Sequence, residues 1–192
     1  MIPPRAGLRL ECRGVVQGVG FRPAVSRLAA SLELDGRLTN VAGAVRLELA
    51  GSRRALEHFL SRLEAALPPP ARLEPLQPQW LEPPLPSPLA GIRGLEITAA
   101  APMPLGASWV APSLVADLAP CPDCLAELDD PRGRRHGYPF ISCSRCGPRW
   151  SIATAEPWCR AHTTLSPFPL CRDCRREFED PRFQLRRRET HA

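Results

Sequence analysis

Two groups of residues in this chain carry chemistry, and each is defined by its spacing. The first is Val16-Gln17-Gly18-Val19-Gly20-Phe21-Arg22, in which two glycines lie one residue apart between an apolar strand and an amphipathic helix. A strand that ends in such a loop lets backbone N–H groups converge beside a helix N-terminus, and this concavity binds anions. Arg22 adds a guanidinium fork that matches phosphate oxygens. The motif therefore predicts a phosphate-binding site at residues 17–22.

Asn40 is a second polar residue that the fold can bring to this loop. It stands at the end of the next predicted strand, Leu38 to Val41, so that its side-chain amide can reach the same pocket. Arg22 stands at the positive end of the predicted helix, where a cation is unfavourable unless an anion binds beside it. The alternative is an ordinary glycine turn with a surface arginine, and the spacing alone leaves it open.

The second group is a series of cysteines in the C-terminal half of the chain. Two C-x2-C pairs are separated by 18 residues, a spacing typical of zinc sites in which each of two turns supplies two thiolates. Four sulfurs leave no open coordination position, so we expect a structural Zn²⁺. A redox pair is the weaker alternative because a matching second pair is present. The predicted ligands are Cys121, Cys124, Cys143 and Cys146.

A further pair, Cys171 and Cys174, begins a second site that the chain does not complete. Another 18 residues would place the next cysteine at position 193, and the sequence ends at 192. Cys159, His162 and His191 are irregularly spaced substitutes. We therefore expect the second metal site to be absent or weak.

The elements that must position these groups follow from hydrophobic periodicity. Leu8, Leu10 and Cys12 alternate with charged residues, which indicates a half-buried strand with Cys12 in the core. Pro23 suits a first helical position, and Ser52 can cap a second helix. The order predicts an α+β, ferredoxin-like βαββαβ fold with two helices on one face of an antiparallel sheet. The segments are strands at 8–12, 38–41, 45–49, 72–80 and 95–97, and helices at 23–32 and 56–67.

Composition divides the chain into two domains. Seven of the eight cysteines follow residue 100, and we expect a first domain at 6–99, a proline-containing linker at 100–113 and a zinc-finger module at 114–192. The last module contains a weak internal echo, because each of two C-x2-C pairs is followed by an acidic segment and a proline. Short helices are expected there at 122–129 and 172–179.

Charge and composition exclude several classes of function. All 25 basic residues are arginine, so neither a lysine Schiff base nor the Gly-x-x-x-x-Gly-Lys nucleotide loop is available. A net charge of +5 is too small to predict nucleic-acid binding by itself. The sequence shows neither a signal peptide nor an apolar run of membrane length, so a cytoplasmic protein without a membrane partner is expected.

The first domain resembles the acylphosphatases over about residues 6–99. The resemblance rests on the glycine loop from Val16 to Arg22, together with Leu38-Thr39-Asn40 and Gly43. It implies that Arg22 and Asn40 are catalytic, with Arg22 binding the phosphoryl group and Asn40 orienting the attacking water. An acyl phosphate suits so small a set of groups, because its carboxylate-like leaving group departs without protonation.

The whole chain resembles the N-terminal part of the HypF-type carbamoyltransferases of NiFe-hydrogenase maturation. The resemblance rests on the two-domain order and on segments such as Tyr138-Pro139-Phe140 and Cys143-x2-Cys146-Gly147-Pro148-Arg149. It implies hydrolysis of carbamoyl phosphate as the first step of carbamoyl transfer, and a partner maturation protein that receives the group. Neither the adenylating domain nor the transfer domain of that family is present in this sequence. We therefore expect this chain to perform the first hydrolysis at most.

Two other hypotheses remain at this point. In one, the cysteine module docks a protein or nucleic acid while the first domain is passive, although aromatic residues that would stack on bases are sparse. In the other, the chain is a truncated, non-functional remnant. Acyl-phosphate hydrolysis that depends on Arg22 separates the enzyme from both.

Overall fold

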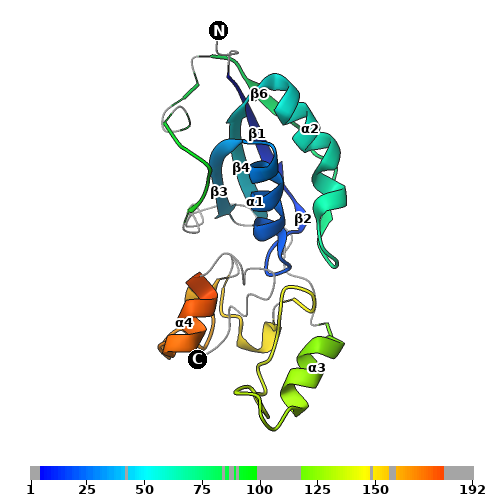
Figure 1. The fold of residues 1–192 in the computed structure, drawn as a ribbon, viewed down its shortest axis with the longest axis vertical. Helices are drawn as coiled ribbons and strands as arrows, with labels where there is room; N and C mark the ends of the chain where they lie inside the picture. Colours follow the sequence, from blue (N-terminus) through cyan, green and yellow to red (C-terminus); the bar gives the residue numbers. More distant parts are fainter. Residues whose placement is uncertain are drawn as a thin grey trace.

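The computed structural model describes residues 5–41, 43–83, 85–86, 89, 91–98, 118–147, 149–155 and 159–179. A sheet with two helices precedes a second part made of short helices and turns (Figure 1). The predicted linker at 100–113 lies outside the described residues, so the domain boundary stays a prediction. The elements are β1 (Ala6–Cys12), β2 (Gly14–Val15), α1 (Phe21–Ser31), β3 (Asp35–Val41), β4 (Ala44–Gly51), α2 (Arg53–Leu63), η1 (Glu64–Ala66), β5 (Arg72–Leu73), β6 (Gln79–Leu81), β7 (Leu95–Thr98), α3 (Pro122–Asp129), η2 (Trp150–Ile152), η3 (Arg160–His162) and α4 (Arg172–Glu179).

Within the described residues, the main sheet has five strands in the order β6-β1-β4-β3-β7. β1 pairs with β4 in antiparallel fashion from Ala6 opposite Gly51 to Cys12 opposite Val45, and β3 and β4 form a hairpin. β7 runs parallel to β3, whereas the sequence predicted an antiparallel sheet. β6 and β7 lie at opposite edges of the sheet and are separated by about a dozen residues in the sequence, a length that permits a parallel neighbour.

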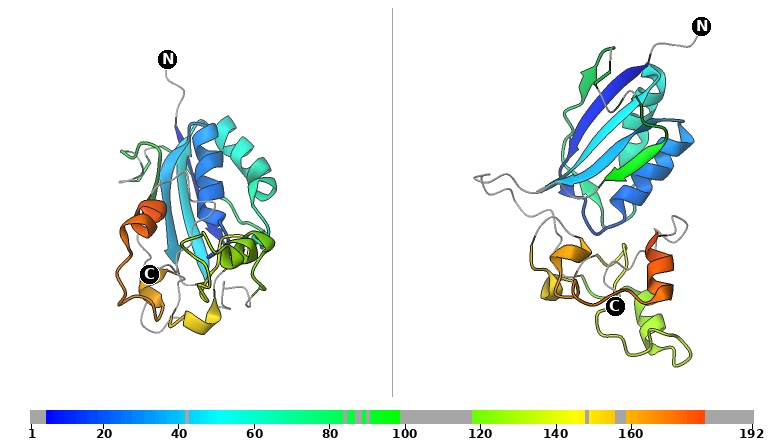
Figure 2. Two further views of the ribbon diagram at one scale, coloured as in Figure 1. Left: turned by 60° about the horizontal axis from the view of Figure 1, so that its bottom comes forward. Right: turned by 90° about the vertical axis from the view of Figure 1, so that its left-hand side faces the viewer.

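Both long helices cover the same face of this sheet, as the right-hand view of Figure 2 shows. The α+β, ferredoxin-like arrangement predicted from the sequence is therefore confirmed. The core lies between sheet and helices, because alternate residues of the central strands and one stripe of each helix point into it. Its fully buried side chains include Leu8, Leu10, Cys12, Val25, Leu47, Leu49, Leu56 and Phe59.

The opposite face of the sheet carries charged side chains. Glu48 on β4 lies between Arg9 on β1 and Arg37 on β3 and forms ion pairs with both. The Arg9 Nε donates to Oε1 of Glu48 over 2.9 Å. Burial would raise the pKa of Glu48, but hydrogen bonds from the two guanidinium groups hold it below its ordinary value.

The structure decides three predictions about local elements. Ser52 caps α2, since its hydroxyl accepts a hydrogen bond from the N–H of Ala55 over 3.2 Å. α1 begins at Phe21, so Pro23 is its third residue and not its first; the ring is still tolerated there because N–H groups of the first turn have no intrahelical acceptor. The strand expected at 72–80 is split into β5 and β6. Pro75 and Pro78 fall between the two pieces, and proline cannot donate to a strand ladder.

The two short helices of the second part have the predicted bounds. α3 follows Cys121 and α4 follows Cys171, and each closes its first turn on the carbonyl of that cysteine. Arg135 joins the two helices, because it forms ion pairs with both Glu127 and Glu177. These two glutamates lie at equivalent positions after their C-x2-C pairs, so the internal echo in the sequence is also a structural one. No helix in the described ranges is long and apolar enough to cross a membrane.

Candidate functional site

The glycine loop of the first domain connects β2 to α1 and turns twice through the left-handed region. Gly18 has a φ of 69°, and Gly20, the N-cap of α1, has a φ of 76° and a ψ of 12°. Residues with a side chain rarely adopt these angles. Such turns bring successive N–H groups toward one point, and the first turn of α1 adds its own. The first turn contains no acidic residue, so nothing in it competes with an anion for the positive helix end.

Gln17 fastens this loop to the β3–β4 hairpin. Its side-chain nitrogen donates to the carbonyl oxygens of Val41 over 3.0 Å and Ala44 over 3.1 Å, and the residue is 1% exposed. Gly43, with a φ of 66°, allows the hairpin to turn between these two carbonyls. The Gln17 side chain therefore holds the loop in place, and the assignment of residue 17 to the phosphate-binding loop stays a prediction.

Asn40 lies next to the fastened end of the hairpin. It is the penultimate residue of β3, opposite Val45, and is buried. The residue interacts with its neighbours, but no donor in the described part of the chain reaches its side-chain Oδ1 atom. A buried acceptor of this kind is commonly satisfied by an ordered water or a ligand. Arg22 is half-buried in the first turn of α1, so the fold brings the loop, Arg22 and the end of β3 to one end of the sheet.

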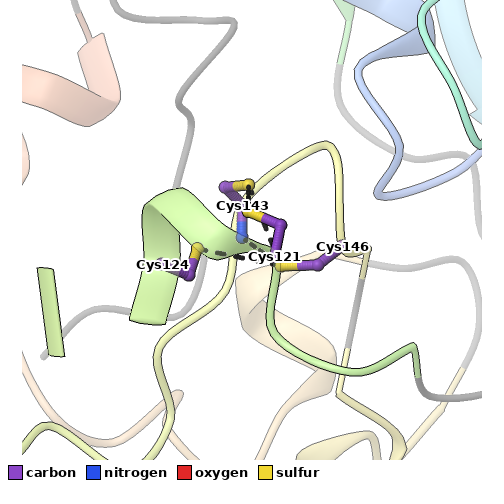
Figure 3. A group of neighbouring side chains, drawn as sticks. All are labelled: Cys121, Cys124, Cys143 and Cys146. Carbon is purple, nitrogen blue, oxygen red and sulfur yellow. Dashed lines mark hydrogen bonds between the residues drawn. The ribbon is translucent and has the colours of Figure 1, made fainter. Parts of the chain in front are cut away.

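The four cysteines predicted as ligands converge in the second part of the chain (Figure 3). Their sulfur atoms all lie within 4.8 Å of one another, with separations of 3.6 Å between Cys121 and Cys143 and 3.8 Å between Cys124 and Cys146. A tetrahedral Zn²⁺ with bonds of about 2.3 Å would place its sulfurs about 3.8 Å apart. Separations of this size suit a tetrahedral metal ion.

The turn that carries Cys143 and Cys146 is closed by backbone hydrogen bonds. The N–H of Cys143 donates to the sulfur of Cys146 over 3.3 Å, and the N–H of Gly147 donates to the Cys143 carbonyl over 2.8 Å. Gly147 has a φ of 73°, which explains the glycine that follows the second cysteine. Hydrogen bonds with Cys124 and Cys143 lower the pKa of Cys146, and hydrogen bonds with Cys143 and Cys146 raise the pKa of Cys124.

Arg149 contacts the four-cysteine cluster through one of its sulfur atoms, although the sequence alone indicated no role for this arginine. Its guanidinium is buried, and it donates to the carbonyls of Leu118 over 2.7 Å and Ile141 over 3.3 Å, and to the sulfur of Cys146 over 3.3 Å. A four-thiolate site carries net negative charge even with a divalent ion, and a buried cation against one sulfur offsets part of it. An arginine close behind a C-x2-C turn is the signal from which this residue could have been found.

Cys171 and Cys174 lie apart from the four-sulfur cluster. In the described part of the chain, the group able to hold a metal consists of the other four cysteines, and neither Cys159 nor His162 joins it. Arg134 instead approaches the second pair, with its Nη1 3.2 Å from the sulfur of Cys174 and 4.0 Å from that of Cys171. His191 lies outside the described residues. Arg134 therefore contacts this pair, for which the sequence predicted an incomplete metal site.

Comparison with known families agrees with both parts of this arrangement. The acylphosphatase family matches residues 8–87, and the HypF finger matches residues 121–153. The latter match includes all four cysteines of the cluster and Arg149. Acylphosphatase from Lacticaseibacillus paracasei is 33% identical over 91 residues, which cover 92% of that protein and 47% of this chain.

Longer relatives match both parts together. Carbamoyltransferase HypF2 from Cupriavidus necator is 41% identical over 170 residues, which make up 88% of this chain and 20% of that protein. The crystal structure of a full-length HypF in its phosphate- and nucleotide-bound form superposes with a TM-score of 0.78 at 31% identity, covering 96% of this chain and 23% of that one. The chain thus spans about a fifth of the length of these relatives. It belongs to the acylphosphatase family through its first domain and, with the HypF finger behind that domain, corresponds to the N-terminal region of the HypF proteins.

Proposed function

We propose that this chain hydrolyses an acyl phosphate, with carbamoyl phosphate as the first candidate, as the opening step of a carbamoyl transfer. The observation that carries the proposal is the double hydrogen bond from Gln17 to Val41 and Ala44. It locks a loop with anion-binding geometry against the end of β3, where Asn40 is the penultimate residue. The activity for which the longer relatives are named, carbamoyl transfer, supports the choice of carbamoyl phosphate.

The chemistry needs few groups. The N–H groups of residues 18–22 and the guanidinium of Arg22 hold the phosphoryl oxygens and offset the charge that grows on them. Asn40 orients a water molecule, whose oxygen forms a bond to phosphorus as the bond from phosphorus to the acyl oxygen breaks. The acyl group leaves as a carboxylate or carbamate without needing a proton, and the protons of the water pass to phosphate and solvent. No nucleophilic side chain is required.

We further propose that the metal of the four-cysteine cluster is Zn²⁺ and that its role is structural. Thiolate ligands in tetrahedral arrangement suit Zn²⁺, and four of them leave no position for substrate. The hydrophobic cluster around these sulfurs is small: Cys124, Ile141, Cys143 and Cys146, with Cys121, Leu128 and Tyr138 partly buried beside them. A core of this size depends on the ion for its stability. A protein that accepts the carbamoyl group stays a prediction for this chain.

Hydrolysis of acyl phosphates by the purified, metal-loaded chain tests the proposal. Arg22→Ala and Asn40→Ala should each lower kcat/KM by about 10²–10³-fold, as expected for loss of a group that acts on the transition state. Arg27→Ala, which removes an exposed arginine from the same helix, is the matched control and should keep the wild-type rate. Rates near background in the wild type, or equal losses in Arg22→Ala and Arg27→Ala, would refute the proposed function.

A further inference from the structure

The glycine loop of the first domain and the cysteine turn of the second part are in contact. In Figure 1 the loop between β2 and α1 faces the turns of the second part. A Cβ atom built on Gly20 would lie 3.1 Å from the Cβ of Ser144 and 3.3 Å from its hydroxyl, and one built on Gly147 would lie 3.8 Å from Cγ1 of Val19. Ser144 and Gly147 belong to the turn that carries Cys143 and Cys146. The candidate phosphate loop therefore borders directly on the metal-binding turn.

This contact clamps the loop from two sides. On its other side, the space at Gly20 is limited by Pro68, which follows η1 in the first domain. A Cβ atom built on Gly20 would lie 3.3 Å from Cγ of Pro68. Val19 and Ser144 are both buried, with exposures of 0% and 6%. Displacement of the loop toward Ser144 meets a side chain that is itself enclosed. The left-handed angle of Gly20, on which the direction of its neighbouring N–H groups depends, is held from both domains.

Ser144 is in turn held by the metal cluster. It lies between two ligands, and the turn is closed by the bonds from Cys143 to Cys146 and from Gly147 to Cys143. The small apolar cluster around the sulfurs cannot fix this turn by burial alone. Metal binding orders such turns as it orders the rest of a finger.

From these contacts we propose that the metal-loaded turn Cys143–Gly147 is part of the anion site, and that Ser144 is a positioning residue which holds the loop Gly18–Gly20 in its anion-binding form. Removal of the metal frees Ser144, and the loop then samples conformations in which its N–H groups diverge. The inference rests on the proposed function only for the nature of the anion, which is a phosphoryl group. The coupling between metal and loop is a separate, measurable property.

The experiment measures amide hydrogen exchange in residues 17–22 of the full chain, with metal bound and after chelation, and follows inorganic phosphate binding by NMR in parallel. Chelation should accelerate exchange in the loop about tenfold while β1 and β4 keep their protection, and should weaken phosphate binding to a similar extent. Ser144→Val places two methyl groups against Gly20 and should have the same effect with the metal still bound. Ser151→Val, at an exposed serine of η2, is the matched control and should change neither quantity.

The outcomes separate the coupling from the function. If Ser144→Val loses its metal, Ser144→Gly replaces it, because removal of the side chain opens a gap at Gly20 without a clash. If chelation accelerates exchange in residues 143–147 but leaves residues 17–22 unchanged, the inference is overturned, whatever the enzyme does. If the loop responds to the metal but the loaded chain binds no phosphate, the coupling stands and the proposed function fails.

Discussion

Arg149 donates from Nη2 to the sulfur of Cys146 over 3.3 Å, and it does so from a buried position. The same guanidinium binds the carbonyls of Leu118 and Ile141. It therefore ties together the chain before α3, the segment before the second cysteine turn, and a metal ligand. A residue with this many fixed contacts sets both the position of the ligand and the charge around it.

Substitution of Arg149 should weaken metal binding. In Arg149→Met the sulfur of Cys146 loses a charge-assisted hydrogen bond and the carbonyls of Leu118 and Ile141 lose their donor. We expect metal affinity to fall by about 10–100-fold. Competition with a chromophoric chelator measures this directly. Arg145→Met is the control, because Arg145 lies in the same turn but is exposed and pairs with Asp123 on the surface. Equal affinities of the two variants would contradict a role for Arg149 in the cluster.

Substitution of Gln17 should lower the stability of the first domain, and any loss of activity should be a consequence of that lower stability. Gln17→Leu keeps the volume but removes the donor that the carbonyls of Val41 and Ala44 share. The free energy of unfolding of the first domain should fall by about 1–3 kcal/mol, the cost of buried acceptors that lose their donors. Urea unfolding, followed through NMR signals of β1 and β4, gives this value. Gln77→Leu, at an exposed position, should leave the midpoint unchanged, and an equally unchanged midpoint for Gln17→Leu would show that the loop is held by other contacts.

The sequence was sufficient for features that depend on local pattern or on ligand chemistry. α3 and α4 have their predicted bounds because each begins at a cysteine turn and ends where its acidic segment meets a proline or a turn. Ser52 caps α2 because a serine directly before a helix commonly accepts a hydrogen bond from a backbone N–H of the first turn. The four ligands could be predicted because two cysteine pairs at this spacing in a small domain most often bind a metal.

The remaining features depend on contacts between distant parts of the chain. Nothing near Gly20 in the sequence points to Ser144, more than a hundred residues away, and nothing near Cys171 points to Arg134. The parallel pairing of β7 with β3 joins residues that are far apart in the sequence, and local propensity does not specify such a partner. Gln17 was assigned to the anion site because it lies in the motif, and the bonds of its side chain to Val41 and Ala44 are contacts between residues 24 and 27 positions apart that the motif does not reveal.

The ion pairs around Glu48 give the first domain a defined pH dependence. Because the pKa of Glu48 is lower in the folded state than its ordinary value of 4.5, its stabilising effect is complete above the unfolded pKa and is lost as the pH falls through the folded one. Glu48→Gln should therefore be less stable than the wild type at pH 7 and approach it as the pH falls below 4.5. The difference at pH 7 should be about 1 kcal/mol, since Arg9 and Arg37 are 41% and 36% exposed and solvent screens the pairs.

The measurement must separate the two domains, since acid also releases metal from thiolates. Urea unfolding at pH 7, 5 and 3.5, followed through NMR signals of β1 and β4, reports on the first domain alone. Glu57→Gln removes an exposed partner of Arg53 on α2 and serves as the control, with a much smaller effect across this range. A difference between Glu48→Gln and wild type that grows as the pH falls would have the wrong sign for this interpretation.

The cysteines should differ widely in their reactivity toward alkylating agents. Burial, with a smaller contribution from Glu11, raises the pKa of Cys12 to about 12, and its side chain is fully enclosed in the core. Cys171 is exposed at the start of α4. Only the thiolate form reacts, and the reagent must also have access to the sulfur atom. A pulse of iodoacetamide at pH 8 should therefore label Cys171 within minutes, and Cys12 only at the rate of global unfolding. Peptide mass spectrometry resolves the two sites. In concentrated urea both should react at similar rates, and rapid native labelling of Cys12 would show that the β1–β4 core is more open than its packing indicates.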